Sequence, residues 1–131
     1  MRLRKYNNKY VAYTGNHKGE DGTVRPSIGL SGVYLQAFGF EPGMWVSGET
    51  APGSIAFTVL NMTLELYESF MGGKQPDNVC LIKVGAYTKN NRRFPLLYMS
   101  GQYLERCGFA AGEPVTIQWK QGRVTIRKIG R

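Results

Sequence analysis

Apolar and polar residues alternate along several short segments of the chain, which is the pattern of half-buried β-strands. The clearest example is Val115–Trp119, where Val, Ile and Trp alternate with Thr and Gln, and Val124–Ile129 follows it after a Lys-Gln-Gly turn. The pattern therefore predicts a mostly β protein. The other predicted pairs are Trp45–Gly48 with Ile55–Leu60 around the turn Ala51–Gly53, Tyr10–Tyr13 with Ser27–Leu30, and Cys80–Tyr87 with Leu96–Met99.

Two seven-residue segments, Gly32–Phe38 and Gly101–Cys107, carry the boundary signals of short helices. A serine precedes each segment, and a serine hydroxyl at an N-cap accepts hydrogen bonds from free backbone N–H groups. A Gly-Phe pair follows each segment, and glycine suits the left-handed position that ends a helix. These boundary residues are Ser31, Gly39 and Phe40 for the first segment, and Ser100, Gly108 and Phe109 for the second.

A third helix is predicted at Thr63–Met71, where Met62, Leu66 and Phe70 recur at helical spacing. The segment has an alternative interpretation as an extension of the preceding hairpin. Its Leu, Glu and Met content favours the helix. The Gly-, Pro- and Asn-containing stretch that follows has the composition of a linker.

The chain contains an internal repeat. At a shift of 69 residues, PSIGLSGVYLQAFGFEPGMWV (residues 26–46) matches PLLYMSGQYLERCGFAAGEPV (residues 95–115), with nine of the 21 positions identical. Upstream, Ala12-Tyr13-Thr14 matches Ala86-Tyr87-Thr88 at a shift of 74, which predicts a loop five residues longer in the first copy. We therefore predict a first repeat over residues 1–60, a linker with a short helix over 61–78, and a second repeat over 79–131.

The segment PLLYMSGQYLERCGFAAGEPVTIQWKQGRVTIR resembles the core of the SymE toxin family, above all in its Gly-Phe-x-x-Gly element and the hairpin that follows. The first copy resembles a degenerate version of it. The resemblance implies a fold of the AbrB and MazE type, in which two units interleave swapped hairpins into one small barrel. Both units lie on one chain here, so the expected molecule is a pseudo-dimeric monomer or a higher oligomer of it. The resemblance also implies nucleic-acid binding and toxicity to the host cell, by RNA cleavage or by DNA binding.

The distribution of charge agrees with a polyanionic partner. The net charge is +8, and residues 74–131 carry eleven basic and three acidic groups, whereas residues 25–73 carry one basic and four acidic groups. Basic groups in three clusters are the predicted nucleic-acid-binding residues, because Arg, Lys and Asn bind phosphates and base edges. The clusters are Arg2, Arg4, Lys5 and Lys9 near the N-terminus; Lys89, Asn91, Arg92 and Arg93 in a loop; and Arg123, Arg127 and Lys128 in the last strand.

Catalytic chemistry has a weaker basis in the sequence. The single histidine, His17, lies in a loop beside Lys18, Glu20 and Asp21, and the general-base candidates Glu105 and Glu113 fall in the second repeat. The sequence has no phosphate-binding glycine loop and no metal-ligand cluster, so we expect no cofactor and no metal. Tyr34 and Tyr103, shared by the two repeats, are expected in the core.

Cys80 and Cys107 are expected to be buried free thiols in a reducing cytoplasm, since neither has ligand partners at metal-binding spacing. No apolar run is long enough for a membrane helix, and no signal peptide is predicted. Three functions remain open: a nucleic-acid-binding protein, with DNA as the expected polymer; an endoribonuclease toxin of a toxin–antitoxin system; and a protein-interaction or inhibitor module.

Overall fold

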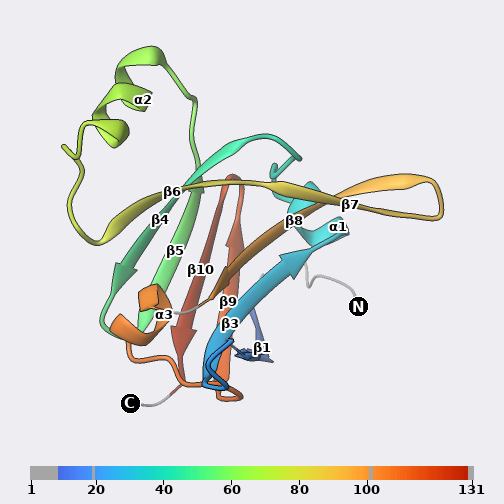
Figure 1. The fold of residues 1–131 in the computed structure, drawn as a ribbon. Coiled ribbons are helices and arrows are strands. Elements are labelled where there is room, and N and C mark those ends of the chain that lie inside the picture. The colour runs from blue at the N-terminus through green and yellow to red at the C-terminus, as the bar shows by residue number, and fades with distance from the viewer. Residues whose placement is uncertain (1–8, 19, 101, 130–131) are drawn as a thin grey trace.

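The structure is a computed structural model that describes residues 9–18, 20–100 and 102–129 (Figure 1). These residues form two antiparallel sheets and short helices, which confirms the mostly β prediction. The larger sheet has the strand order β1-β9-β10-β5-β4-β6, and the smaller has β2-β3-β8-β7. The strands are β1 (Lys9–Tyr13), β2 (Gly15–Lys18), β3 (Val24–Ser31), β4 (Trp45–Ala51), β5 (Ser54–Val59), β6 (Val79–Lys83), β7 (Gly85–Lys89), β8 (Arg92–Ser100), β9 (Pro114–Lys120) and β10 (Arg123–Lys128), and the helices are α1 (Val33–Ala37), α2 (Leu64–Met71) and α3 (Gln102–Arg106).

The chain crosses from one sheet to the other at one buried residue in each half, Thr14 and Val84. The Thr14 N–H donates to the Glu113 carbonyl at 3.0 Å, and the Val84 N–H donates to the Met44 carbonyl at 2.9 Å. As a result, β1 and β6 form the edges of the larger sheet, while β2 and β7 form the edges of the smaller one. The prediction of a closed barrel is therefore wrong for the part of the chain described, because the crossing leaves two open sheets.

The strand order of each sheet reads the same from both ends when β1–β5 are matched with β6–β10. The β9–β10 hairpin of the C-terminal half lies between β1 and β5 of the N-terminal half. The tips of the two long hairpins also make matching contacts, since Gly53 N–H donates to the Cys107 carbonyl at 2.8 Å and Gly122 N–H donates to the Phe38 carbonyl at 2.7 Å. A duplicated unit would give this arrangement, and the duplication itself stays a prediction.

Three details of the predicted strand pairing are wrong. The predicted strand Cys80–Tyr87 is divided between β6 and β7; β6 pairs with β4, where Cys80 lies opposite Gly48, and only β7 pairs with β8. β1 pairs with β9, where Tyr10 lies opposite Ile117, and not with β3. Residues 12–14 also do not correspond to residues 86–88, because the first triplet spans the end of β1 and the crossing residue Thr14, whereas the second lies in β7 and pairs with β8. Gly15 and Gly85 begin the matching strands β2 and β7, so the hairpins after them are almost equal in length. A match of only three residues cannot decide which strands of the two halves correspond, because the alternation of a strand is compatible with either alignment.

The helix ends follow the predicted glycine signals. Gly39 and Gly108 have φ angles of 92° and 91°. The N–H groups of Phe40 and Phe109 bond back to the carbonyls of Leu35 and Leu104, at 2.9 and 3.1 Å, as in a Schellman motif. The predicted serine N-caps are wrong: Ser31 and Ser100 are the last residues of β3 and β8, and Gly32 is the N-cap of α1, where no side chain makes a capping bond. The strands end one residue later than expected because β3 and β8 pair with each other up to these serines.

The Gly108→Ala variant is expected to lose about 1–2 kcal/mol of folding free energy, because an L-residue resists the left-handed conformation. A Cβ at this position would meet only the Lys128 Nζ at 3.7 Å, so the loss reports backbone strain and not a clash. The matched control is Gly85→Ala, at a strand position where φ lies outside the left-handed region. Urea denaturation of both variants measures the difference, and equal midpoints would show that the helix end tolerates a side chain.

The core lies between the two sheets and beneath helices α1 and α3. Leu35 of α1 and Leu104 of α3, one from each half of the chain, are fully buried. Tyr34 and Tyr103 pack against this core as predicted. The buried side chains of the larger sheet include Val46, Ile55, Phe57, Val115, Ile117, Trp119, Val124 and Ile126, and those of the smaller sheet include Ile28, Leu30, Leu97 and Met99.

The α2 helix confirms the prediction for the segment between the halves. Thr63 is its N-cap, and its hydroxyl accepts a hydrogen bond from the Leu66 N–H at 3.1 Å. None of its residues is buried, although the Tyr67 ring contacts Trp45 edge-on at a centroid distance of 6.2 Å. No helix among the described residues is long and apolar enough to cross a membrane.

Candidate nucleic-acid interface

The hairpin of β7 and β8 carries the central predicted cluster on a tight turn. Asn90 and Asn91 have φ angles of 52° and 62°, which is the left-handed pair of a two-residue type I′ turn and a conformation that asparagine tolerates. The register places Lys89 opposite Arg92 directly beside the turn. Figure 1 shows that the turn end of this hairpin projects beyond the other elements of the protein. The turn therefore presents several predicted binding residues together at the tip of a projecting element.

The cations of this hairpin are available for a ligand. Lys89, Arg92 and Arg93 are exposed, and within the described part of the chain none of them forms an ion pair. Arg92 lies on the same face as Lys89, with its guanidinium carbon 5.3 Å from the centroid of the Phe94 ring. Arg93 lies opposite Thr88 and points to the other face of the ribbon. The hairpin can thus contact phosphates from both of its faces.

An aromatic pair forms the base of the hairpin. The rings of Tyr87 and Phe94 stack at a centroid distance of 5.5 Å with planes 28° apart. They lie opposite each other in the register, so cross-strand stacking adds to the stability of the ribbon. The pair therefore holds the exposed cations on a stiffened support.

The C-terminal cluster lies on a different surface. Arg123 and Arg127 alternate with buried Val124 and Ile126, so they point outward from the larger sheet, away from the smaller one. The Arg123 guanidinium donates to the Thr58 hydroxyl at 2.7 Å. Lys120, which the sequence predicts in a turn, is the last residue of β9 and lies opposite Arg123 on the same outer face. The structure therefore does not bring this cluster together with the β7–β8 hairpin.

Lys128 has a structural role. Its ammonium group donates to the Gly108 carbonyl at 2.8 Å and lies 4.0 Å from the Glu113 carboxylate. The first contact satisfies a carbonyl at the end of α3, where a cation is favourable. The prediction that Lys128 contacts nucleic acid stays untested, and its side chain already has two partners.

We expect Lys128→Met to lower the folding free energy by about 0.5–1.5 kcal/mol while leaving nucleic-acid affinity within about twofold. The reason is that the Gly108 carbonyl loses its donor while the hairpin cations are untouched. Thermal denaturation and a binding titration on the same preparation test both parts. A large loss of nucleic-acid affinity without loss of stability would show instead that Lys128 contacts nucleic acid.

The N-terminal cluster is only partly within the described residues. Arg2, Arg4 and Lys5 lie outside them. Lys9 begins β1, where the register places it opposite Gln118, and its side chain is outside the description. Their role as binding residues stays a prediction.

Comparison with known families identifies the segment that contains the hairpin. Residues 79–128 match the family model of the toxin SymE of type I toxin–antitoxin systems. This match confirms the resemblance found in the sequence for the C-terminal half, from β6 to β10. We call residues 79–128 the SymE-like segment. Comparisons with curated proteins and with solved structures gave no match.

The matching hairpin outside the SymE-like segment, β2 with β3, is electrostatically weaker. The Arg25 guanidinium lies 3.0 Å from the Glu105 carboxylate, a half-exposed ion pair. The Thr23 hydroxyl and backbone N–H donate to the Asp21 carboxylate, and these bonds lower the pKa of Asp21 below its ordinary value. Asp21 is therefore an anion within this hairpin, and its charge interacts with that of Arg25. The two hairpins are alike in topology and unlike in charge.

The candidate general bases of the SymE-like segment already have partners. Glu105 pairs with Arg25, and the Glu113 carboxylate accepts a bond from the Ala110 N–H at 2.8 Å. The side chain of His17 lies outside the description. Among the described residues, no three His, Cys, Asp or Glu side chains are placed to hold a metal ion. The described geometry shows charge suited to binding and no assembled acid–base pair.

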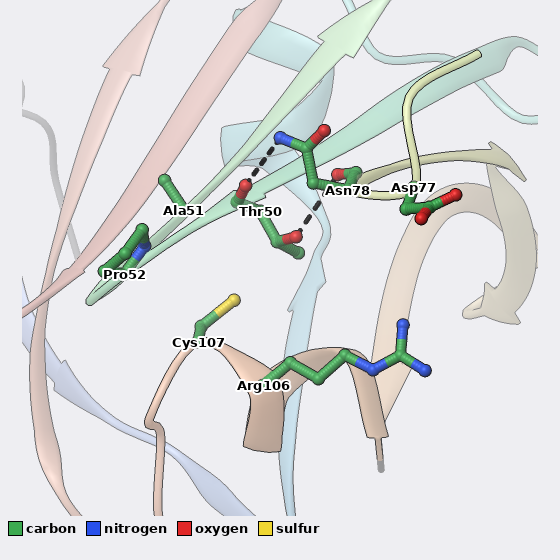
Figure 2. Close-up of a pocket in the computed structure, with 7 residues that line it drawn as sticks. All are labelled: Thr50, Ala51, Pro52, Asp77, Asn78, Arg106 and Cys107. Atoms are coloured by element: carbon green, nitrogen blue, oxygen red, sulfur yellow. Dashed lines mark hydrogen bonds between the residues drawn. The ribbon is translucent and has the colours of Figure 1, made fainter.

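A pocket of about 260 Å³ lies between the tip of the β4–β5 hairpin, the linker and α3 (Figure 2). On one wall, the Asn78 side-chain amide donates to the Thr50 carbonyl at 2.8 Å, and the Thr50 hydroxyl donates to the Asn78 carbonyl at 3.2 Å. Burial raises the pKa of the Cys107 thiol on the other wall, and its sulfur lies 3.2 Å from the Tyr103 carbonyl. A protonated, bonded thiol is a poor nucleophile, so the pocket does not have the chemistry of a catalytic site.

Burial also raises the pKa of Cys80, and both cysteines are free thiols. Cys107 is buried as predicted, whereas Cys80 is only partly buried.

The sequence analysis missed the aromatic side chains of the β7–β8 hairpin as part of the candidate site. Exposed and buried residues alternate along β8, which places Phe94 and Tyr98 on the outer face of the smaller sheet. The sequence signal for this outer face is that Phe94 and Tyr98 alternate with Pro95, Leu97 and Met99 along one strand. The alternation predicts a strand here but does not decide which of its faces is exposed.

Proposed function

We propose that this protein is a SymE-like toxin that acts by binding RNA through its β7–β8 hairpin. The observation that carries the proposal is that the family match includes the hairpin, whose cations are exposed and free of ion pairs among the described residues. The match supports a toxin more directly than the DNA-binding function expected first. Electrostatic contacts to phosphates do not require an assembled catalytic centre.

Cleavage of RNA is the second candidate activity, because the resemblance implies it for some relatives. The partners of Glu105 and Glu113 argue for binding without cleavage, since both carboxylates would have to leave their contacts to act as bases. A toxin arrests the growth of the cell that expresses it, so expression supplies a direct test of the proposal. The toxin would act in the bacterial cytoplasm as a monomer with two pseudo-equivalent halves, a duplication supported by the matching strand order and hairpin contacts.

The test is controlled expression in a bacterial host, followed by ultraviolet crosslinking and analysis of total RNA. We expect growth arrest on induction and recovery of crosslinked RNA with the protein, while the RNA stays full-length. RNA fragments that vanish with Glu105→Gln would establish the endoribonuclease instead. Normal growth together with crosslinking to DNA alone would overturn the proposal in favour of a DNA-binding protein.

A further inference from the structure

One face of the smaller sheet exposes a row of apolar and aromatic side chains. Arg92, Phe94, Leu96 and Tyr98 are partly or fully exposed on β8, whereas Pro95, Leu97 and Met99 between them are buried. Alternate residues of a strand point to the same face, so the four exposed side chains form one line along β8. We call Tyr87, Phe94, Leu96 and Tyr98 the aromatic face.

The surroundings leave this face open. Gly29 of β3 lies opposite Tyr98, and a Cβ built on Gly29 would be 3.6 Å from the Tyr98 ring. Gly85 of β7 lies opposite Leu96. Because glycine has no side chain, the strands on both sides of β8 place no side chain beside Tyr98 and Leu96 at these two positions. The Tyr98 side chain accordingly remains 48% exposed on a strand in the middle of the sheet.

Packing in the hydrophobic core does not account for the exposure of this row, although the Tyr87–Phe94 stack stabilises the ribbon. The core of the protein lies on the other face of β8, where Leu97 is 1% exposed. Contiguous exposed apolar surface on a soluble domain is a feature of binding sites. The cations at one end of the row, Arg92 and Lys89, select an anionic ligand with flat apolar parts. A nucleotide has both properties, as phosphate and base.

We infer that the aromatic face is a stacking platform for unpaired bases, which makes the protein selective for single strands over duplexes. The inference rests on the proposed function and specifies how its ligand is held. In a duplex the faces of the bases are covered by their neighbours, whereas in a single strand they can stack on aromatic rings. The sheet surface presents rings in the way that four-stranded RNA-binding sheets do.

The geometry assigns separate tasks along β8. Phe94 and Tyr98 are four residues apart, roughly 13 Å at about 3.3 Å per residue, which leaves room for two or three bases. The exposed Arg92 guanidinium beside Phe94 is on a flexible side chain and can move to a phosphate, freeing the ring for a base. Tyr87 supports Phe94 from the neighbouring strand.

The test compares a fluorescein-labelled RNA dodecamer without self-complementarity with its duplex at one salt concentration. For Tyr98→Leu we expect single-strand affinity to fall by about tenfold, within the range found for loss of one base–aromatic stack. Duplex affinity should stay within about twofold, and the salt slope on the single strand should not change. Tyr98→Phe should restore single-strand affinity because it keeps the ring. Tyr13→Leu is the matched control, since Tyr13 is 71% exposed on the larger sheet.

Equal affinity of wild type and Tyr98→Leu for the single strand would overturn the platform, as would an equal loss on single strand and duplex. If that happens while Arg92 and Arg93 variants still lose affinity, the platform fails and the proposed function stands. If the wild type binds neither RNA, both fail. Because Tyr98 is half exposed, the leucine variant is expected to fold, and a circular dichroism spectrum checks this.

Discussion

Replacing Trp119 by alanine should cost about 3–5 kcal/mol of folding free energy and leave much of the protein unfolded. Trp119 lies on β9 of the C-terminal half and is 1% exposed. Its ring stacks on Phe38 at 5.3 Å and on Tyr34 at 6.0 Å, both from the α1 region of the N-terminal half. Loss of the indole would therefore leave a cavity where the two halves share one core.

The Trp119→Phe variant is the control for this prediction. The indole Nε1 is buried, and within the described residues it has no hydrogen-bond partner. Phenylalanine removes this unsatisfied donor and keeps most of the packing, so its loss should be clearly smaller than that of alanine. Urea denaturation followed by circular dichroism measures both variants. A Trp119→Ala protein as stable as the wild type would mean that the halves do not depend on a common core.

The sequence predicted the elements of this fold better than their arrangement. The glycines at 39 and 108 specify the helix ends because few other residues adopt the left-handed conformation that ends a helix. Alternation identified the hairpins, because burial on one face leaves a period of two. The crossing at Thr14 and Val84 could not be predicted, since a strand that changes sheets keeps the same alternation on both sides. Because the chain changes sheets there, the structure has two open sheets in place of the expected closed barrel.

The Arg92→Gln/Arg93→Gln double variant should bind single-stranded RNA about tenfold more weakly at low salt, a change of about 1.4 kcal/mol. The salt dependence should change as well. Each phosphate contact on a single strand contributes about 0.7 to the slope of log affinity against log salt, so losing two should flatten it by about 1.4. Both side chains are exposed, so the fold should be retained.

The matched control is Lys18→Gln/Arg25→Gln in the β2–β3 hairpin. Its effect should be smaller, because Arg25 is already paired with Glu105 and also interacts with the Asp21 carboxylate. Fluorescence anisotropy titrations at several salt concentrations give the slopes for both variants. An equal loss in the two double variants would show that the halves bind symmetrically, and the charge argument would then be wrong.

The candidate site was predictable only where its chemistry is local. The run from Lys89 to Arg93 is basic in sequence and remains a cluster in space, because a two-residue turn keeps it compact. The C-terminal cluster differs from the hairpin cluster, because one of its cations is already bonded. The Lys128 ammonium group donates to the carbonyl of Gly108, twenty residues away in the chain. The exposure of Phe94 and Tyr98 depends on which face of β8 packs against the core. The position of the larger sheet decides this, and the sequence of β8 alone does not show it.

The central claim is that RNA binds at the β7–β8 hairpin, and a titration followed by amide chemical shifts tests it residue by residue. Adding the unlabelled RNA dodecamer to the isotopically labelled full chain should shift the amides from Tyr87 to Phe94 most strongly, with Tyr98 next. The amides of β2 and of the outer face of β10 should move little. Shifts concentrated at Arg123 and Arg127, or none at the hairpin under saturating RNA, would contradict the account.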